Sequence, residues 1–140
     1  WDGDSEMPGA FLIQSASQMQ YIYKFLFSEG TAYQDLVLEK QLLEPNQTRN
    51  EDKNMGWAYC MHTETKDFFM LYFEKDCPKT ILNGTRPGAN YEIHWFDASE
   101  GNWVKNELVK SDREGKIKMP EFPSGSGIST GDWAVKLILR

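Results

Sequence analysis

The stretch Tyr91–Trp103, which reads YEIHWFDASEGNW, decides the fold predicted for this chain. Its first half has apolar side chains at every second position, the period of a strand with one buried face. The residues DASEG then supply turn chemistry, and Gly101 can take the positive φ that closes a short hairpin loop. The stretch therefore predicts an antiparallel hairpin in which Trp95 points inward, with Tyr91 and Ile93, and Trp103 opens the return strand.

Short segments with the same period occur on both sides of this hairpin. Turn signals separate them every 8–12 residues or so, and no helical pattern connects them, which excludes a parallel sheet. We therefore predict a mainly β fold, a seven-strand antiparallel immunoglobulin-like β-sandwich. Trp57, Trp95 and Trp133 are in phase with apolar neighbours and are expected in its core. The predicted strands are Met55–His62, Phe68–Glu74, Thr80–Leu82, Tyr91–Asp97, Trp103–Lys110, Lys116–Met119 and Trp133–Arg140.

The first third of the chain has a helical period instead. A helix is predicted from Ala10 to Glu29 with Gly30 as its C-terminal stop, followed by a short helical turn at Tyr33–Leu36 and a polar linker. The chain thus divides into a helical segment, residues 1–47, and a β-sandwich domain, residues 48–140. The helix ends in YIYKFLF, which is apolar nearly all round and needs burial on more than one side. Either a neighbouring domain or a second copy of the chain covers it, or the chain covers it from within.

Composition excludes several classes of function. The formal net charge is −6 and no basic patch is present, so nucleic-acid binding is not expected. The apolar runs are too short to span a membrane. Two cysteines, Cys60 and Cys77, are no disulfide framework; reduced thiols are favoured, and a bond between neighbouring strands is the alternative. With only two histidines there is no metal-ligand spacing, and no cofactor is expected.

No catalytic constellation is visible either. The serines of Ser124–Gly127 lack the strand and helix that flank a nucleophile. The two histidines, His62 and His94, have no acid or nucleophile at a fixed spacing. Asp2, Asp4 and Glu6 form an acidic start that is best explained as a solvated terminus. The chain is therefore not expected to be an enzyme by itself, and Trp103 is the single candidate for contact with a ligand.

Two motifs together resemble a known family. Pro8-Gly9-Ala10 with Gln18-Met19 opens the helix, and W-F-D-x-x-x-G-x-W, residues 95–103, forms the hairpin. This order resembles the C-terminal end of glycoside-hydrolase-like proteins with an apiosidase-like (β/α)₈ barrel, whose terminal sandwich is catalogued as a collagen-binding domain. On that resemblance, residues 1–47 look like the last barrel helix and its exit segment, and residues 48–140 look like the sandwich.

The resemblance implies a function and a set of partners. The chain would be a non-catalytic accessory domain that packs against a catalytic barrel and stabilises it. The alternative that the resemblance leaves open is a module that binds collagen or polysaccharide. The residues themselves do not give the location; the resemblance favours a secreted or periplasmic one.

Overall fold

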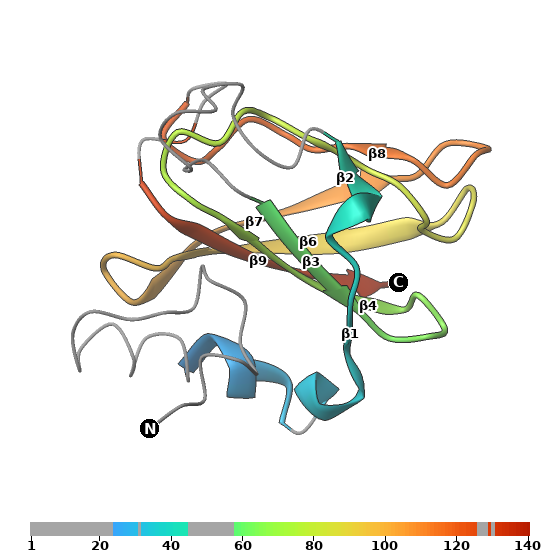
Figure 1. The fold of residues 1–140 in the computed structure, drawn as a ribbon, viewed down its shortest axis with the longest axis horizontal. Coiled ribbons are helices and arrows are strands. Elements are labelled where there is room, and N and C mark those ends of the chain that lie inside the picture. The colour runs from blue at the N-terminus through green and yellow to red at the C-terminus, as the bar shows by residue number, and fades with distance from the viewer. Residues whose placement is uncertain (1–23, 31, 45–57, 126–128, 130) are drawn as a thin grey trace.

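The computed structural model describes residues 24–30, 32–44, 58–125, 129 and 131–140. These residues form two antiparallel sheets and a short helical segment (Figure 1). The predicted helix before Lys24, the linker at Pro45–Lys53 and the predicted core residue Trp57 lie outside the described residues. The mainly β, antiparallel class predicted from the sequence is confirmed.

The larger sheet has six strands in the order β1-β3-β4-β9-β6-β7, each antiparallel to its neighbour. The three-stranded sheet has the order β2-β5-β8. Every strand expected from the period of two is present, and two short strands, β1 and β2, precede them. The strands of the large sheet are β1 (Val37–Leu38), β3 (Ala58–His62), β4 (Phe68–Phe73), β9 (Trp133–Leu139), β6 (Asn90–Asp97) and β7 (Asn102–Lys110). The strands of the small sheet are β2 (Leu43–Glu44), β5 (Ile81–Leu82) and β8 (Ile117–Lys118).

The main core lies between the two sheets. Trp95 is 1% exposed, and its ring centroid lies 5.9 Å from that of Phe122 and 6.3 Å from those of Phe73 and Trp133. Alternate residues of β4, β6 and β9 face this core, as the period of two requires. The small sheet contributes three fully buried side chains to the same core: Leu43, Leu82 and Ile117. Trp95 and Trp133 are therefore core residues, as the sequence predicts.

The central hairpin joins β6 to β7. Gly101 has φ 74°, and its N–H donates to the carbonyl of Asp97 at 2.7 Å, which closes the turn. Trp95 pairs with Lys105, but its neighbour Phe96 pairs with Trp103, so β7 contains one extra residue, Val104. This β-bulge brings Trp103 onto the same sheet face as Phe96, opposite to the face that buries Trp95.

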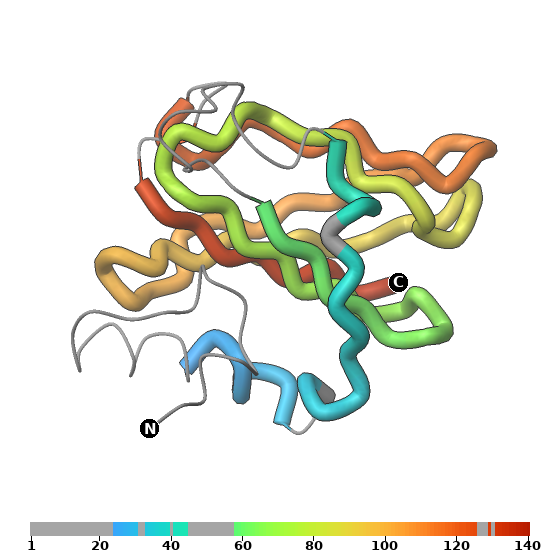
Figure 2. Tube along the Cα trace, in the orientation of Figure 1, coloured from blue at the N-terminus to red at the C-terminus, as the bar shows by residue number. Residues whose placement is uncertain are grey.

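The helical segment lies on the far side of the large sheet from the small sheet (Figure 1). Residues 24–26 end the predicted helix, η3 (Phe27–Glu29) tightens its last turn, and Gly30 stops it at φ 64°. The short turn η4 (Ala32–Asp35) follows. The chain then pairs with β3 through β1, passes through η5 (Lys40–Leu42) and enters the small sheet as β2 (Figure 2). One continuous segment therefore connects the helical layer to both sheets.

Candidate functional site on the outer face of the large sheet

The face of the large sheet that looks away from the small sheet is apolar and buried. We call it the outer face, and the side chains packed there the outer-face cluster. A sheet with one face in a core usually presents polar residues on the other. Here β4 is buried at every position, which requires a second layer. The cluster's buried members are Phe25, Phe68, Met70, Tyr72, Phe96, Ala98 and Ala134, with Leu26, Tyr33, Leu36, Tyr59, Met61, Trp103 and Ile138 packed against them.

Phe25 is the side chain by which the helical segment enters this cluster. It is 1% exposed, and its ring centroid lies 5.7 Å from that of Phe96 and 5.8 Å from that of Trp103. Phe96 and Trp103 in turn meet edge to face at 4.9 Å. Each aromatic pair of this kind adds about 0.5–1.5 kcal/mol beyond the burial of its area. The end of the helix is thus packed into the sheet and not merely laid over it.

Two lysines add polar contacts around this aromatic group. The ammonium of Lys136 lies 2.6 Å from a carboxylate oxygen of Glu29 and 4.6 Å from the ring centroid of Trp103. The Lys136 side chain is only 8% exposed, so these two partners offset the cost of burying its ammonium group. From the helix, Lys24 donates to the carbonyl of Gly101 in the hairpin loop at 2.9 Å. These contacts fix the orientation of the helix end on the sheet, in addition to the burial of Phe25.

Trp103, the ligand candidate predicted from the sequence, lies inside this arrangement. It is partly buried, with Lys136 over its ring and the rings of Phe25, Phe96 and His94 around it. Its contacts join the hairpin to the helical segment. Its role toward a ligand remains a prediction.

The structure does not bring the two histidines together. His62 ends β3 and is 4% exposed, with its ring nitrogens 2.6 Å from a carboxylate oxygen of Glu39 and 2.7 Å from the carbonyl oxygen of Thr63. The hydrogen bond with His62 holds the pKa of the Glu39 carboxyl below its ordinary value. His94 lies in β6, which is three positions from β3 in the sheet order, and it pairs with Glu92 at 2.9 Å. Both histidines therefore have structural partners.

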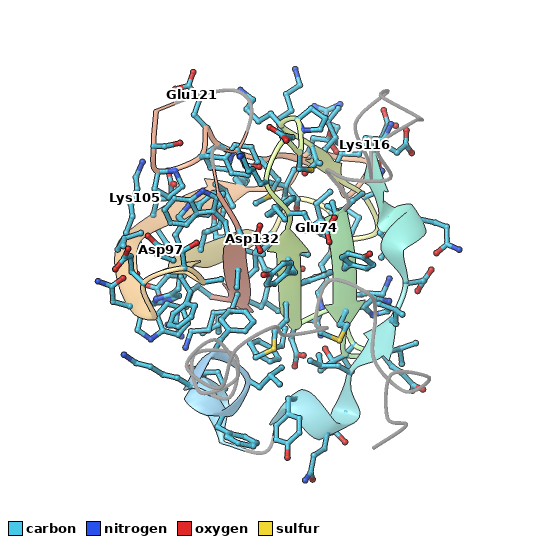
Figure 3. All side chains as sticks on the ribbon, turned by 60° about the vertical axis from the view of Figure 1, so that its left-hand side comes forward. Glu74, Asp97, Lys105, Lys116, Glu121 and Asp132 are labelled. Atoms are coloured by element: carbon cyan, nitrogen blue, oxygen red, sulfur yellow. The ribbon has the colours of Figure 1, made fainter. Side chains whose placement is uncertain are left out.

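Two aspartates, Asp97 and Asp132, also have structural roles. Asp97 ends β6 and accepts hydrogen bonds from the amides of Ser99 and Glu100 at 2.9 and 3.1 Å. Asp132, just before β9, accepts from the hydroxyl of Tyr72 and from the amide of Lys75, both at 2.9 Å. Figure 3 shows both aspartates, which mark one end of the large sheet. They hold turns, and this arrangement is not a pair of carboxylates across a cleft. The acidic residues Asp2, Asp4 and Glu6 lie outside the described residues.

Cys60 and Cys77 are free and buried in the main core between the two sheets. Burial raises the pKa of the Cys60 thiol, and it raises that of Cys77 to about 12. In the described part of the chain, no three His, Cys, Asp or Glu side chains gather where they would hold a metal ion. No helix in those same residues is long and apolar enough to cross a bilayer. The reduced thiols favoured by the sequence are what the structure contains.

Three members of this site were not predicted from the sequence: Lys136, Glu29 and Lys24. A signal for Lys136 was present: it occupies the outer-face phase of β9 between Ala134 and Ile138. A lysine in the middle of an apolar face needs an acidic partner or an aromatic ring. Which acid supplies that partner depends on where the helix end packs on the sheet, and this tertiary contact has no local signal in the sequence.

Comparisons with known proteins give a likeness of fold. No protein-family model matches the chain, and no curated protein matches it. A solved structure of a glycoside hydrolase matches 86% of this chain with a TM-score of 0.57 and 18% identity. A glycoside hydrolase family 5 structure from Bacteroides vulgatus ATCC 8482 matches 86% with a TM-score of 0.56 and 16% identity. This chain covers 24% and 23% of those two chains, so it spans about a quarter of their length.

The extent of these matches is informative about the fold. Residues 48–140 make up only about two thirds of the chain. A match over 86% of it must therefore extend into residues 1–47. The shared fold includes part of the N-terminal segment together with the sheets.

Proposed function

We propose that this chain is a non-catalytic accessory β-sandwich of a glycoside-hydrolase-like protein, which packs against a catalytic barrel and stabilises it. The observation that carries the proposal is the docking of the helix end on the outer face. In this reading that helix is the last helix of the barrel, and the sheet holds it through Phe25, Lys24 and Glu29. The seven predicted strands form the immunoglobulin-like part of the module.

The exposed side of the helical segment supports this reading. Phe27 is 51% exposed, and Val37 and Leu38, in the strand that follows, are 45% and 49% exposed. Large apolar side chains in this number on one segment are typical of a surface that meets a partner. A barrel helix has two apolar sides, one toward the sheet described here and one toward its own barrel. The remaining three quarters of the glycoside hydrolases with this fold leave room for such a barrel.

The proposed lack of catalysis rests on how the carboxylates are used. A glycosidase needs two carboxyl groups about 5–10 Å apart across a bound sugar, one of them commonly with a raised pKa. Here Asp97 and Asp132 hold backbone amides, and the pKa of Glu39 and of Glu92 is lowered by hydrogen-bonded partners. Lowered values favour the charged form and suit structural ion pairs. These four carboxyl groups are therefore set up for structure.

Three measurements test the proposal. The full-length gene should encode the rest of a (β/α)₈ barrel directly upstream of Trp1, and a gene without it contradicts the proposal. The purified chain should show no turnover of chromogenic glycosides, whereas turnover above background would make it an enzyme. Pull-down on insoluble plant polysaccharides and on collagen should give no more than background binding. Saturable binding that Trp103→Ala abolishes would replace our proposal with the binding-module alternative.

A further inference from the structure

Strand β7 forms a free edge of the large sheet. It is the last strand in the sheet order, and among the described residues it pairs only with β6. It is nine residues long and mostly exposed, with Leu108 at 71% and Val104 at 45%. Natural proteins usually keep an edge strand short, or cover it, because unpaired backbone groups invite another strand. A long exposed edge with two exposed apolar side chains needs an explanation.

Two hydrogen bonds show which backbone groups of β7 face outward. The amide of Arg140 donates to the carbonyl of Asn90, and that of Ser111 donates to the carbonyl of Ala89, both at 2.9 Å. Even-numbered residues of β6 therefore bond toward β9, and odd-numbered ones bond toward β7. By register, Lys105, Glu107 and Val109 are the β7 residues that bond to β6. Asn106 and Leu108, which lie between them, direct their N–H and C=O groups to the free side.

The sequence of this edge is self-complementary when two copies meet antiparallel with Asn106 at the centre. Lys105 of each copy then lies opposite Glu107 of the other, on the face that contacts the core. Val104 lies opposite Leu108 of the second copy, so the exposed apolar residues cover each other. Centring the pair on residue 105 or 107 would place two lysines or two glutamates opposite each other, which is unfavourable. Only the register centred on Asn106 places Lys105 opposite Glu107, so the charges favour it.

We propose that β7 pairs with β7 of a second copy of this chain about a two-fold axis at Asn106, which joins the two large sheets into one. Glu107 is already oriented for this, because it accepts from the indole N–H of Trp95 at 2.9 Å and lies 3.6 Å from Lys105 of its own strand. In the dimer the four charges alternate in sign along the seam. The lysine and the bulge discourage pairing with unrelated strands.

This surface differs from the helix face on which the sequence analysis placed a dimer. One pair of strands buries less area than a standard interface of roughly 1,200–2,000 Å². Self-association is therefore expected to be weak, with a dissociation constant above ~1 µM. A dimer of this kind forms at high local concentration, as on a cell surface or along a polymer.

Sedimentation equilibrium of the purified chain from low micromolar to millimolar concentration tests the proposal. The wild type should show a monomer–dimer equilibrium. Lys105→Glu and Glu107→Lys should each raise the dissociation constant ~10-fold or more, because each places like charges opposite each other. An equimolar mixture of these two variants should dimerise again, because every opposed pair in the heterodimer is then of opposite sign. Lys116→Glu, which makes the same charge change in a distant turn, should leave the equilibrium as in the wild type.

Asn106→Pro is a second, uncharged test. It removes an N–H that does not bond to β6, so the hairpin keeps its own hydrogen bonds and circular dichroism should remain native. This variant should be monomeric at millimolar concentration. A wild type that is monomeric throughout would overturn the proposal. So would a dimer that persists in Lys105→Glu and Asn106→Pro, since that dimer would use another face.

Discussion

Replacing Phe25 with alanine tests whether the helical segment is an integral layer of the fold. The side chain is 1% exposed and fills the space between Phe96 and Trp103. Truncating a buried phenylalanine costs about 3–5 kcal/mol. The loss is limited to the free energy that docks the segment on the sheet, because a segment weakened beyond that limit would detach before the sheets unfold. We therefore expect a loss at the low end, about 3 kcal/mol.

The assay is urea unfolding of the full chain followed by tryptophan fluorescence, to which Trp103 contributes as one of five tryptophans. Phe27→Ala is the matched control, because it removes the same side chain two residues further along from a position that is 51% exposed. We expect that control to lose no more than about 1 kcal/mol. If Phe25→Ala loses as little as Phe27→Ala, the segment is not held by the outer-face cluster and our reasoning fails.

Three further outcomes follow from the described contacts. Lys136→Met should lower the free energy of unfolding in urea by about 1–2 kcal/mol. The loss is moderate because the Lys136 side chain is 8% exposed, whereas the Glu29 side chain that loses its partner is 37% exposed and stays solvated. Gly115→Ala should lower the melting temperature more than Gly88→Ala, although both have positive φ, because a Cβ at Gly115 would lie 2.4 Å from a backbone oxygen and one at Gly88 would meet nothing within 4 Å. Asp112 accepts from the amide of Lys116, which holds the pKa of its carboxyl below its ordinary value. The resulting stability is present above the ordinary pKa of the group and is lost as the pH falls through the folded-state pKa, so Asp112→Asn should flatten the acid limb of a stability–pH curve.

The strands were predictable because their signal is local. A period of two in β6 and β9 places Trp95 and Val135 on one face whatever the rest of the chain does. Turn residues such as Gly101 then fix where each strand ends. The division into a sheet of six and a sheet of three is less local, since β2, β5 and β8 have only two residues each. Periodicity cannot assign so short a strand to either sheet.

The candidate site was predictable only in part. The sequence singled out Trp103 but not its surroundings, because the bulge at Val104 decides which face Trp103 joins. The position of Phe25 against Phe96 depends on contacts between residues about 70 positions apart. The apolar outer-face residues of β4, such as Met70, were the available hint that a second layer covers the sheet. That layer, once found, also gives Lys136 its partner.

The most direct test of the proposed function is calorimetry of a protein that contains both this chain and the barrel we propose for it. Our proposal makes the docked helix end a part of that barrel, so it predicts that the barrel and the sheets melt in one cooperative transition. Phe25→Ala should separate that transition into two. Phe27→Ala should weaken the coupling between the barrel and the sheets less than Phe25→Ala does. Two independent transitions in the wild type, each at the temperature of the isolated part, would contradict the account.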